Sequence, residues 1–374
     1  MIRVLHIIDK LSVDGSGIHG IARALEWWGS RIDPAQVSFR ILSLRGREEE
    51  AAGFFERRGI DLQFVKLGKF DPRTIPVLCR EALQWEADVL HLHGYASTNF
   101  GRIAARILNR PNVVHEHVVF PSQPFYQEWA DRLLSGVTDA SLAISPAVAE
   151  FMIEERCVPA AGLETFFYGI PFDEFTEPTE EEIAAARKEA GVPEGGEVIV
   201  TAGRLAPQKG LGTLVEAFAA LAPKRKDAHL VIVGEGPERS VVEAAAAEAG
   251  LSERVHLVGF QSDVRPWIAM GNVFVIPSFF EGGPITLFEA MRLSRAIIST
   301  PVGVVPQAIR DGENGVLVEV GDAQQLERAL GRILEDPGFQ KGLGAQAFAD
   351  SNEWDVQIAV DRLTDFYQRL TGKW

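Results

Sequence analysis

The chain has 374 residues, of which 46% are hydrophobic and 24% charged, a composition typical of a globular protein with more than one domain. Its formal net charge of −15 disfavours broad nucleic-acid binding, and no apolar run is long enough to cross a bilayer. The first residues lack the pattern of a secretion signal, and the two cysteines, Cys79 and Cys157, form neither a disulfide framework nor a zinc pattern. We therefore expect a cytoplasmic protein with reduced thiols and no nucleic-acid partner.

Short apolar runs alternate with helical segments through the first half of the chain. The predicted strands are residues 4–8, 37–44, 64–67, 88–93, 112–117 and 140–145. Runs rich in β-branched residues that alternate with helices indicate βαβ units, and their continuous apolar character indicates a parallel sheet covered on both faces. The pattern predicts a Rossmann-like domain over residues 1–170.

A second series of the same kind follows an acidic stretch with three prolines, residues 169–196, which we interpret as a linker containing the first helix of the next domain. The second set of predicted strands is 197–204, 229–236, 254–260, 272–278, 296–303 and 315–320. This predicts a second doubly wound parallel-sheet domain over residues 171–355. The two domains are expected to face a cleft, because open α/β sheets bind ligands at the carboxyl ends of their strands. An amphipathic helix over residues 356–374 is expected to pack back towards the first domain.

The strongest local motif is GRLAPQKG, residues 203–210, which follows a predicted strand and opens a helix. Gly203 and Gly210 permit close backbone approach, while Arg204 and Lys209 supply a planar fork and a point charge that both suit phosphate. The alternative is a helix-start turn whose charges are only solvated.

A second motif, SFFEGGPITLFEA at residues 278–290, also follows a strand. Its glycines and proline predict a tight turn into a helix, and the free N–H groups of Ile285 to Leu287 would form an anion site at that helix start. Glu281 in the turn and Glu289 two helical turns later can accept hydrogen bonds from hydroxyls at two ends of one ligand. The alternative is one glutamate that favours the helix dipole and a second that is exposed.

Two weaker motifs complete the set. GEGP at residues 234–237 lacks the G-x-G-x-x-G form and does not lie in the first βα unit, so nicotinamide binding is not supported. DGENGVLV at residues 311–318 is typical of a structural turn.

Together, GRLAPQKG, GEGP, PSFFEGGPITLFEA and NGVLV resemble, in order and spacing, the family 4 (group 1) glycosyltransferases of the GT-B fold. The resemblance covers essentially the whole chain, and its carboxyl-terminal motifs are the more specific. It implies an enzyme that moves a sugar from a nucleotide diphosphate donor to a hydroxyl acceptor with retention of anomeric configuration, in glycan, polysaccharide or glycolipid synthesis.

The resemblance also implies residue roles. Arg204 and Lys209 would hold the donor diphosphate, Glu281 the sugar hydroxyls and Glu289 the ribose, and His115 would approach the transferred sugar. The other implied donor-binding positions lie in loops and turns: Gly15, Gly17, Gly203, Gly234, Gly259, Phe260, Gly282, Gly283, Ile285, Thr286 and Leu287.

We expect no metal and no cofactor, because the sequence contains no Asp-x-Asp pair and the cationic side chains can take the place of a cation. Two positions of VGVVPQAI, residues 302–309, depart from the family pattern: Val304 replaces a glycine and Gln307 a glutamate. That loop often touches the donor, so these departures bear on the choice of donor.

Two His-x-His pairs, His91/His93 and His115/His117, end predicted strands of the first domain. Residues at i and i+2 share a strand face and could ligate a metal, which makes a metal-dependent hydrolase the rival enzymatic interpretation. Other rivals keep the fold: a sugar-nucleotide epimerase, a phosphorylase, or a non-catalytic sugar-nucleotide-binding subunit.

The acceptor is the least determined part. Residues 1–170 carry 18 basic and 21 acidic side chains, and a local basic group there is either a solvated face or a site for an anionic acceptor or an acidic membrane surface. We assign Arg45, Arg47, His93 and His117 as acceptor contacts. A UDP-sugar donor is favoured over a GDP-sugar. The expected acceptor is a sugar, a lipid-linked sugar or a small alcohol. The sequence does not determine peripheral membrane contact or the oligomeric state.

Overall fold

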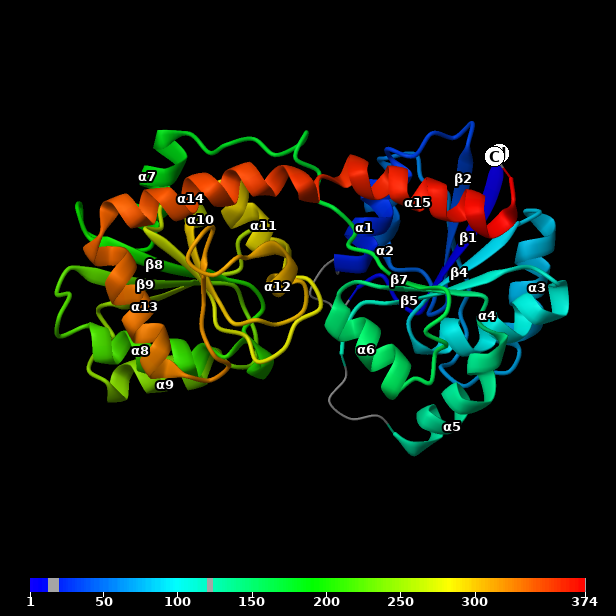
Figure 1. Cartoon of the computed structure of the whole chain (residues 1–374), viewed down its shortest axis with the longest axis horizontal. Helices are drawn as coiled ribbons and strands as arrows, with labels where there is room; N and C mark the ends of the chain where they lie inside the picture. Colours follow the sequence, from blue (N-terminus) through cyan, green and yellow to red (C-terminus); the bar gives the residue numbers. More distant parts are fainter. Residues whose placement is uncertain (13–19, 120–123, 374) are drawn as a thin grey trace. The chain divides into compact units, whose positions relative to one another are not determined.

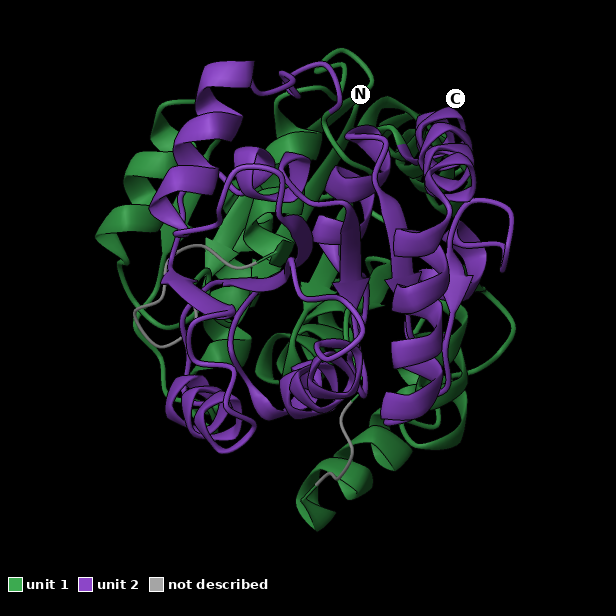
Figure 2. Cartoon of the chain, turned by 90° about the vertical axis from the view of Figure 1, so that its left-hand side faces the viewer, with its two compact units in different colours: residues 1–171, 355–374 green, residues 172–354 purple. Residues whose placement is uncertain are grey.

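The computed structural model describes residues 1–12, 20–119 and 124–373, and the chain divides into two compact units. Unit 1 contains Met1–Pro171 and Asp355–Trp374, and unit 2 contains Phe172–Trp354 (Figure 2). Within the described ranges, no helix is both long and apolar enough to cross a membrane.

Unit 1 is built on a seven-stranded parallel sheet with the order β3-β2-β1-β4-β5-β6-β7 (Figure 1). Its strands are β1 (Ile2–Ile8), β2 (Val37–Ser43), β3 (Leu62–Phe64), β4 (Val89–His93), β5 (Asn112–Glu116), β6 (Ala140–Ala143) and β7 (Leu163–Thr165). The central strands β4, β5 and β6 are buried throughout, as expected for a parallel sheet covered on both faces.

The helices of unit 1 follow the strands in turn. They are α1 (Gly20–Gly29), α2 (Glu49–Glu56), α3 (Thr74–Gln84), α4 (Tyr95–Leu108), α5 (Phe125–Leu134), α6 (Pro146–Glu154) and the carboxyl-terminal α15 (Val356–Thr371), with a 3₁₀ turn η1 (Ser135–Val137). Helix α15 packs against α1 and β1, and the Val356 amide donates to the Ile170 carbonyl at 2.9 Å. The carboxyl-terminal helix therefore completes the first sheet's helical cover.

Unit 2 repeats the architecture with six parallel strands in the order β10-β9-β8-β11-β12-β13. The strands are β8 (Glu197–Ala202), β9 (Ala228–Val233), β10 (Val255–Gly259), β11 (Val273–Ile276), β12 (Ala296–Ser299) and β13 (Val316–Leu317). In both sheets the strand order reverses beside the first strand, and this crevice at the carboxyl ends is where open α/β sheets bind ligands. In unit 2 it lies between β8 and β11.

The helices of unit 2 enclose one hydrophobic core around Phe218, Leu230 and Ile298. They are α7 (Glu180–Glu189), α8 (Leu211–Leu221), α9 (Arg239–Glu248), α10 (Arg265–Ala269), α11 (Ile285–Arg292), α12 (Val305–Ala308), α13 (Ala323–Glu335) and α14 (Pro337–Ser351), with 3₁₀ turns η2 (Pro207–Lys209) and η3 (Asn352–Trp354). Helix α7 begins with a capping box between Thr179 and Glu182, inside the stretch that we interpreted as a linker.

The predicted fold class is confirmed, since both sheets are parallel, helix-covered and Rossmann-like. Every predicted strand contains or overlaps an observed one, although β3 begins two residues earlier than predicted and β13 has only two residues. Strand β7 is missing from the prediction because LET has no apolar run to reveal it. The predicted cleft between the domains stays a prediction.

Candidate active site

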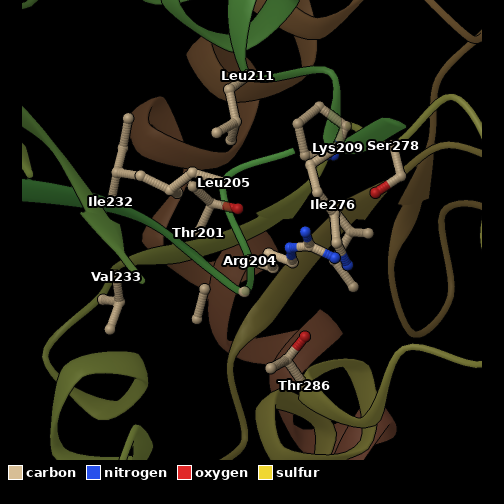
Figure 3. A pocket seen from close by; sticks show the side chains of 13 residues that line it. Thr201, Arg204, Leu205, Lys209, Leu211, Ile232, Val233, Ile276, Ser278 and Thr286 are labelled. Carbon is tan, nitrogen blue, oxygen red and sulfur yellow. The ribbon is translucent and has the colours of Figure 1, made fainter. Parts of the chain in front are cut away.

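A pocket in unit 2 lies at the carboxyl ends of β8 and β11, the crevice where the strand order reverses. Its polar lining comes from Thr201, Arg204, Lys209, Ser278 and Thr286. Figure 3 shows the Arg204 and Lys209 side chains reaching into the same space, with the Thr286 hydroxyl on the opposite side. The two strongest motifs of the sequence therefore meet in one place.

The GRLAPQKG segment is fixed by two glycines. Gly203, with φ +152°, directly follows β8 and leads into the loop that carries Arg204, while Gly210, with φ +62°, joins η2 to α8. A Cβ on Gly210 would lie 2.0 Å from the carbonyl oxygen of Pro277, so only glycine lets this turn touch the strand end of β11. The turn is held there by the Phe279 amide, which donates to the Gln208 carbonyl at 2.7 Å.

Lys209 and Glu281, 72 residues apart, form an ion pair across this contact. Lys209 Nζ lies 2.5 Å from Glu281 Oε1, and the Ser278 hydroxyl donates to the same oxygen at 2.9 Å. The side chains are 22% and 13% exposed, and Lys209 also lines the pocket. Arg204 is exposed, and no ion pair holds its guanidinium within the part of the chain that the structure describes.

Helix α11 points its first turn at the pocket. Pro284 precedes it in an extended conformation and gives no side-chain cap, and the amides of Ile285 and Thr286 have no hydrogen-bond partner among the described residues. Open amides at a helix start, with the positive end of the helix dipole, favour a bound anion. Two side-chain cations and a helix start thus surround one space suited to a diphosphate.

Three glycines predicted as donor contacts lie side by side at the ends of β8, β9 and β10. The Gly203 amide donates to Val233 at 2.9 Å, and the Gly234 amide donates to Gly259 at 2.8 Å. A Cβ on Gly234 would lie 1.9 Å from the Gly203 carbonyl oxygen. Because these three neighbouring residues have no side chains, they form a flat backbone surface on which a planar ligand group can lie.

The remaining donor positions fall around this surface. Phe260 follows β10 and is 71% exposed. Glu289 is partly buried and lies one turn beyond the first turn of α11. The pKa of Arg265 is raised mainly by Asp263, and the charge of Glu289 adds to this effect. Gly282, Gly283 and Leu287 lie in the turn and first turn of α11. Gly15 and Gly17 lie outside the described residues.

Val304, which replaces a glycine of the family pattern, adds a side chain but still makes a backbone hydrogen bond to the turn before α11. The Val304 amide donates to the Gly282 carbonyl at 3.0 Å, and its side chain is fully buried. The neighbouring Gly303, with φ +57°, has no room for a Cβ, which would lie 2.3 Å from the Gly282 oxygen. Gln307 is exposed on α12. The loop after β12 therefore supports the Glu281 turn through its backbone.

In unit 1, five histidines from β1, β4 and the end of β5 form a buried hydrogen-bonded chain with Tyr367 of α15. One arm runs from the Tyr367 hydroxyl to His91 Nδ1 at 2.6 Å, and from His91 Nε2 to His115 Nδ1 at 3.2 Å. The second arm runs from the same hydroxyl to His6 Nε2 at 3.4 Å. It continues from His6 Nδ1 to His93 Nε2 at 3.0 Å, and from His93 Nδ1 to His117 Nε2 at 3.0 Å.

This chain constrains the tautomer of every member. Burial lowers the pKa of His6 to about 3 and holds the pKa of His91 and His115 well below the usual value, so the rings are neutral near pH 7. A neutral imidazole has one donor and one acceptor nitrogen. A phenol is a stronger donor than a neutral imidazole, so we assign Tyr367 as the donor to His91, which places the His115 proton on Nε2. The phenol has only one proton, so its oxygen accepts from His6 Nε2. Along the second arm, this places the protons of His6, His93 and His117 on Nε2 as well.

The predicted catalytic residue His115 is 1% exposed, with its ring stacked on Trp28 at 6.0 Å and on His117 at 4.1 Å between centroids. Its Nε2 atom has no hydrogen-bond partner among the described residues. His117 directly follows the last residue of β5 and is 8% exposed, whereas His93 is fully buried. The structure thus orders these histidines by depth, and their roles towards substrate stay predictions.

Among the residues that the structure describes, two sets of three histidines could hold a metal ion, because one nitrogen from each member lies within 4.8 Å of the others. The sets are His6, His91 and His93, and His93, His115 and His117. Both sets are buried, but His93, which belongs to both, already has its two ring nitrogens in hydrogen bonds with His6 and His117, and no carboxylate joins either set. A cation there would have to replace those hydrogen bonds. Metal independence stays a prediction.

The two arginines assigned to the acceptor are both engaged within unit 1. Arg45 donates to the Leu67 carbonyl at 2.9 Å and lies 3.9 Å from the carboxylate of Asp9, while Arg47 pairs with Glu49 at 2.9 Å. Arg45 is thus beside the end of β1, where unit 1 has its own strand-order reversal. Arg47 lies farther along the loop, at the start of α2.

Sequence reasoning missed Asp9 and Ser278. Asp9 follows β1 and accepts from the Ala96 and Ser97 amides at 3.0 and 2.7 Å, which closes the start of α4. Ser278 orients Glu281. Each is a polar residue within two positions of the end of an apolar strand, and that position in a parallel sheet could have indicated both.

Comparison with known proteins gives the same class as the fold. The model described as glycosyl transferases group 1 matches residues 182–350, and the model described as glycosyltransferase family 4 matches residues 20–174. The chain therefore belongs to the group 1 glycosyltransferases, of the family 4 type with a GT-B fold.

Among its relatives is the alpha-D-kanosaminyltransferase of Streptomyces kanamyceticus, 26% identical over 263 residues that cover 70% of this chain and 67% of the relative. The 2-deoxystreptamine glucosyltransferase of the same organism is 28% identical over 314 residues, covering 78% and 79%. The crystal structure of Anabaena HepE in complex with UDP matches with a TM-score of 0.84 at 19% identity, over 98% of this chain and all of that one.

Proposed function

We propose that this glycosyltransferase is a retaining, metal-independent enzyme that takes its sugar from a nucleotide diphosphate donor bound in unit 2. The observation that carries the proposal is the pocket where Arg204, Lys209 and the open first turn of α11 surround one space. Phosphate oxygens fit that lining because it offers a guanidinium fork, an ammonium and free amides together. The complex of HepE with UDP, a protein of the same fold, supports a uridine donor, and a GDP-sugar is the alternative.

The chemistry follows from where charge develops. When the sugar leaves, negative charge grows on the diphosphate, so Arg204, Lys209 and the α11 amides stabilise the transition state more than the ground state. In a retaining reaction with attack on the face of departure, the leaving phosphate helps to take the acceptor proton. Glu281 lies beside Lys209 and would bind sugar hydroxyls, and Glu289 on α11 would bind the ribose.

The base would lie on the surface formed by Gly203, Gly234 and Gly259. Each of these residues is a glycine for a local reason: Gly203 has φ +152°, Gly259 has φ +78°, and a Cβ on Gly234 would meet the Gly203 oxygen. The exposed ring of Phe260 lies at the edge of this surface and can stack on the base.

The acceptor is proposed to bind unit 1 at His93 and His117, which lie at the end of β4 and directly after β5, and at Arg45 and Arg47 in the loop after β2. His115 on β5 would approach the transferred sugar. One Streptomyces relative is named an alpha-D-kanosaminyltransferase and the other a 2-deoxystreptamine glucosyltransferase, and these names support a small-molecule or sugar acceptor for this chain. A lipid-linked sugar would present the same hydroxyl chemistry.

The test is ligand binding followed by product analysis. A thermal-shift panel of UDP- and GDP-sugars should show one base raising the melting temperature of the wild type, because a ligand that binds only the native state stabilises it. Arg204→Ala should lose most of this shift. Lys341→Ala is the matched control, since it removes an exposed cation from α14 of the same unit without a pairing partner in the described chain.

Product analysis separates the transferase from its rivals. Proton NMR should show the donor's anomeric configuration in the product, and a chelator should leave turnover unchanged. A new sugar nucleotide formed without acceptor would identify an epimerase instead. Donor binding without any turnover across acceptor classes would favour a non-catalytic binding subunit, and chelator-sensitive turnover would reject metal independence.

A further inference from the structure

Helix α5 has its polar and apolar faces reversed relative to an ordinary helix of a globular unit. Asp131 is its one buried residue, with no exposed surface. Four large hydrophobic side chains of the same helix are exposed instead: Phe125 at 74%, Tyr126 at 40%, Trp129 at 61% and Leu133 at 75%. Surface helices normally bury their apolar stripe and expose their carboxylates, so α5 requires an explanation.

Ion pairs hold the helix in this orientation. Asp131 accepts from Arg102 of α4 at 3.1 Å and from Arg156 after α6 at 2.7 Å, and Arg156 also pairs with Glu116 at the end of β5. Two cations and two anions balance, as buried charges must. Since this contact fixes the inner face of α5, its aromatic side chains have to point outward.

The exposed side chains form one continuous patch. Positions 125, 126, 129 and 133 repeat at intervals that place them on one side of the helix. Phe70, which is 61% exposed, extends the patch, because its ring meets that of Tyr126 at 5.5 Å between centroids. Contiguous exposed apolar area of this kind marks an interaction surface.

Cations border the patch. Lys69 Nζ lies 5.4 Å from the centroid of the Phe70 ring, and Arg132 is exposed in the last turn of α5. Glu128 is the one exposed acidic side chain of this helix, so cations outnumber anions here. The overall charge of −15 is spread over the whole chain, and salt screens its effect beyond about 8–10 Å.

We infer that this patch, the exposed face of α5 with Lys69 and Phe70, docks on the surface of a lipid bilayer with anionic headgroups. Tryptophan, tyrosine and phenylalanine beside lysine and arginine are the side chains that favour the membrane interface. Four of the exposed hydrophobic side chains of the patch lie on α5, at the outer edge of unit 1, which suits insertion into a yielding surface (Figures 1 and 2). A rigid protein partner would need a matching groove.

The experiment is flotation of the full-length protein with vesicles of phosphatidylcholine, alone or mixed with phosphatidylglycerol. Wild type should float with the mixed vesicles, and the triple variant Phe125→Ser/Trp129→Ser/Leu133→Ser should lose about tenfold or more of the bound fraction, since binding scales with buried apolar area. The matched control is Leu83→Ser/Ile107→Ser, which removes exposed hydrophobic side chains of α3 and α4 in the same unit. It should float like wild type.

Two further measurements keep the inference open to refutation. Brominated lipid should quench tryptophan fluorescence in wild type, and Trp129→Phe should abolish that quenching. Lys69→Glu/Arg132→Glu should reduce flotation only with the anionic mixture. Thermal melts and UDP binding should match wild type in every variant, which separates this inference from the donor site.

Failure of the wild type to float, or equal flotation of the triple variant, would overturn the inference. Self-association of wild type that the triple variant abolishes, without any flotation, would also overturn it and identify a second copy of the chain as the occupant.

Discussion

The Lys209–Glu281 pair makes a quantitative prediction about the donor site. Lys209→Ala removes a cation that we propose contacts phosphate, and a hydrogen bond between charged groups contributes about 1.5–3 kcal/mol. It also leaves the Glu281 carboxylate, held 2.5 Å from Lys209 in the wild type, without its cation next to the diphosphate. The variant therefore loses an attraction and gains a repulsion.

The repulsion can be estimated. Two unit charges at about 5 Å, with an effective dielectric constant of about 20, interact by about 3 kcal/mol. Because the Lys209 and Glu281 side chains keep 22% and 13% exposure, we reduce this to about 1.5 kcal/mol for solvent screening. Lys209→Ala should then weaken UDP binding by about 3–4.5 kcal/mol, which is a factor of about 10² to 10³.

The second substitution is the informative one. Glu281→Gln in the Lys209→Ala background removes the uncompensated charge and should restore about tenfold of the lost UDP affinity, whereas Glu281→Gln alone should not tighten binding by that amount. Isothermal titration calorimetry with UDP, compared through a double-mutant cycle, measures this coupling. Lys341→Ala should bind like wild type.

If the double variant binds UDP no more tightly than Lys209→Ala, the Glu281 carboxylate does not face the diphosphate. If Lys209→Ala binds UDP as wild type does, the diphosphate lies elsewhere and the proposed site is wrong.

Three further predictions concern stability and proton positions. Gly234→Ala should destabilise unit 2 by about 2 kcal/mol or more in denaturant unfolding, because the new Cβ would lie 1.9 Å from the Gly203 oxygen at a φ of +136°; an unchanged midpoint would contradict this packing. Tyr367→Phe should change the imidazole ¹⁵N shifts of His115 from a single Nε2–H tautomer to a mixture, while Thr364→Val, which removes another buried hydroxyl of α15, should not. The free energy of unfolding should fall as the pH drops from about 6.5 towards 3, because His6 is protonated near pH 6.5 in the unfolded chain and only near pH 3 in the folded chain. Each such histidine changes the free energy of unfolding by up to about 1.4 kcal/mol per pH unit. A free energy of unfolding that does not change with pH, measured by chemical denaturation, would show that the cluster is not buried as described.

The sequence was sufficient for the fold class because its signals are local. Apolar runs of strand length alternate with helical spacing from Ile2 to Leu317, and that alternation permits only a parallel sheet with helical cover. The motifs around Lys209 and Glu281 were also readable, since each consists of a strand, a glycine turn and a helix start within a few residues.

Contacts between distant segments were decided by the tertiary structure. The approach of Lys209 to Glu281 depends on Gly210 lying against Pro277, and the surface of Gly203, Gly234 and Gly259 depends on strand register. No periodicity in the sequence specifies which strand lies beside which.

Helix α5 shows the limit most clearly. Its spacing of Phe125, Trp129 and Leu133 would ordinarily place those side chains in a core, yet the ion pairs of Asp131 with Arg102 and Arg156 turn them outward. Sequence periodicity determines that a helix has two faces. Which face is buried depends on partners brought by other strands and helices, because burial free energy is a property of the assembled contact and not of the segment alone.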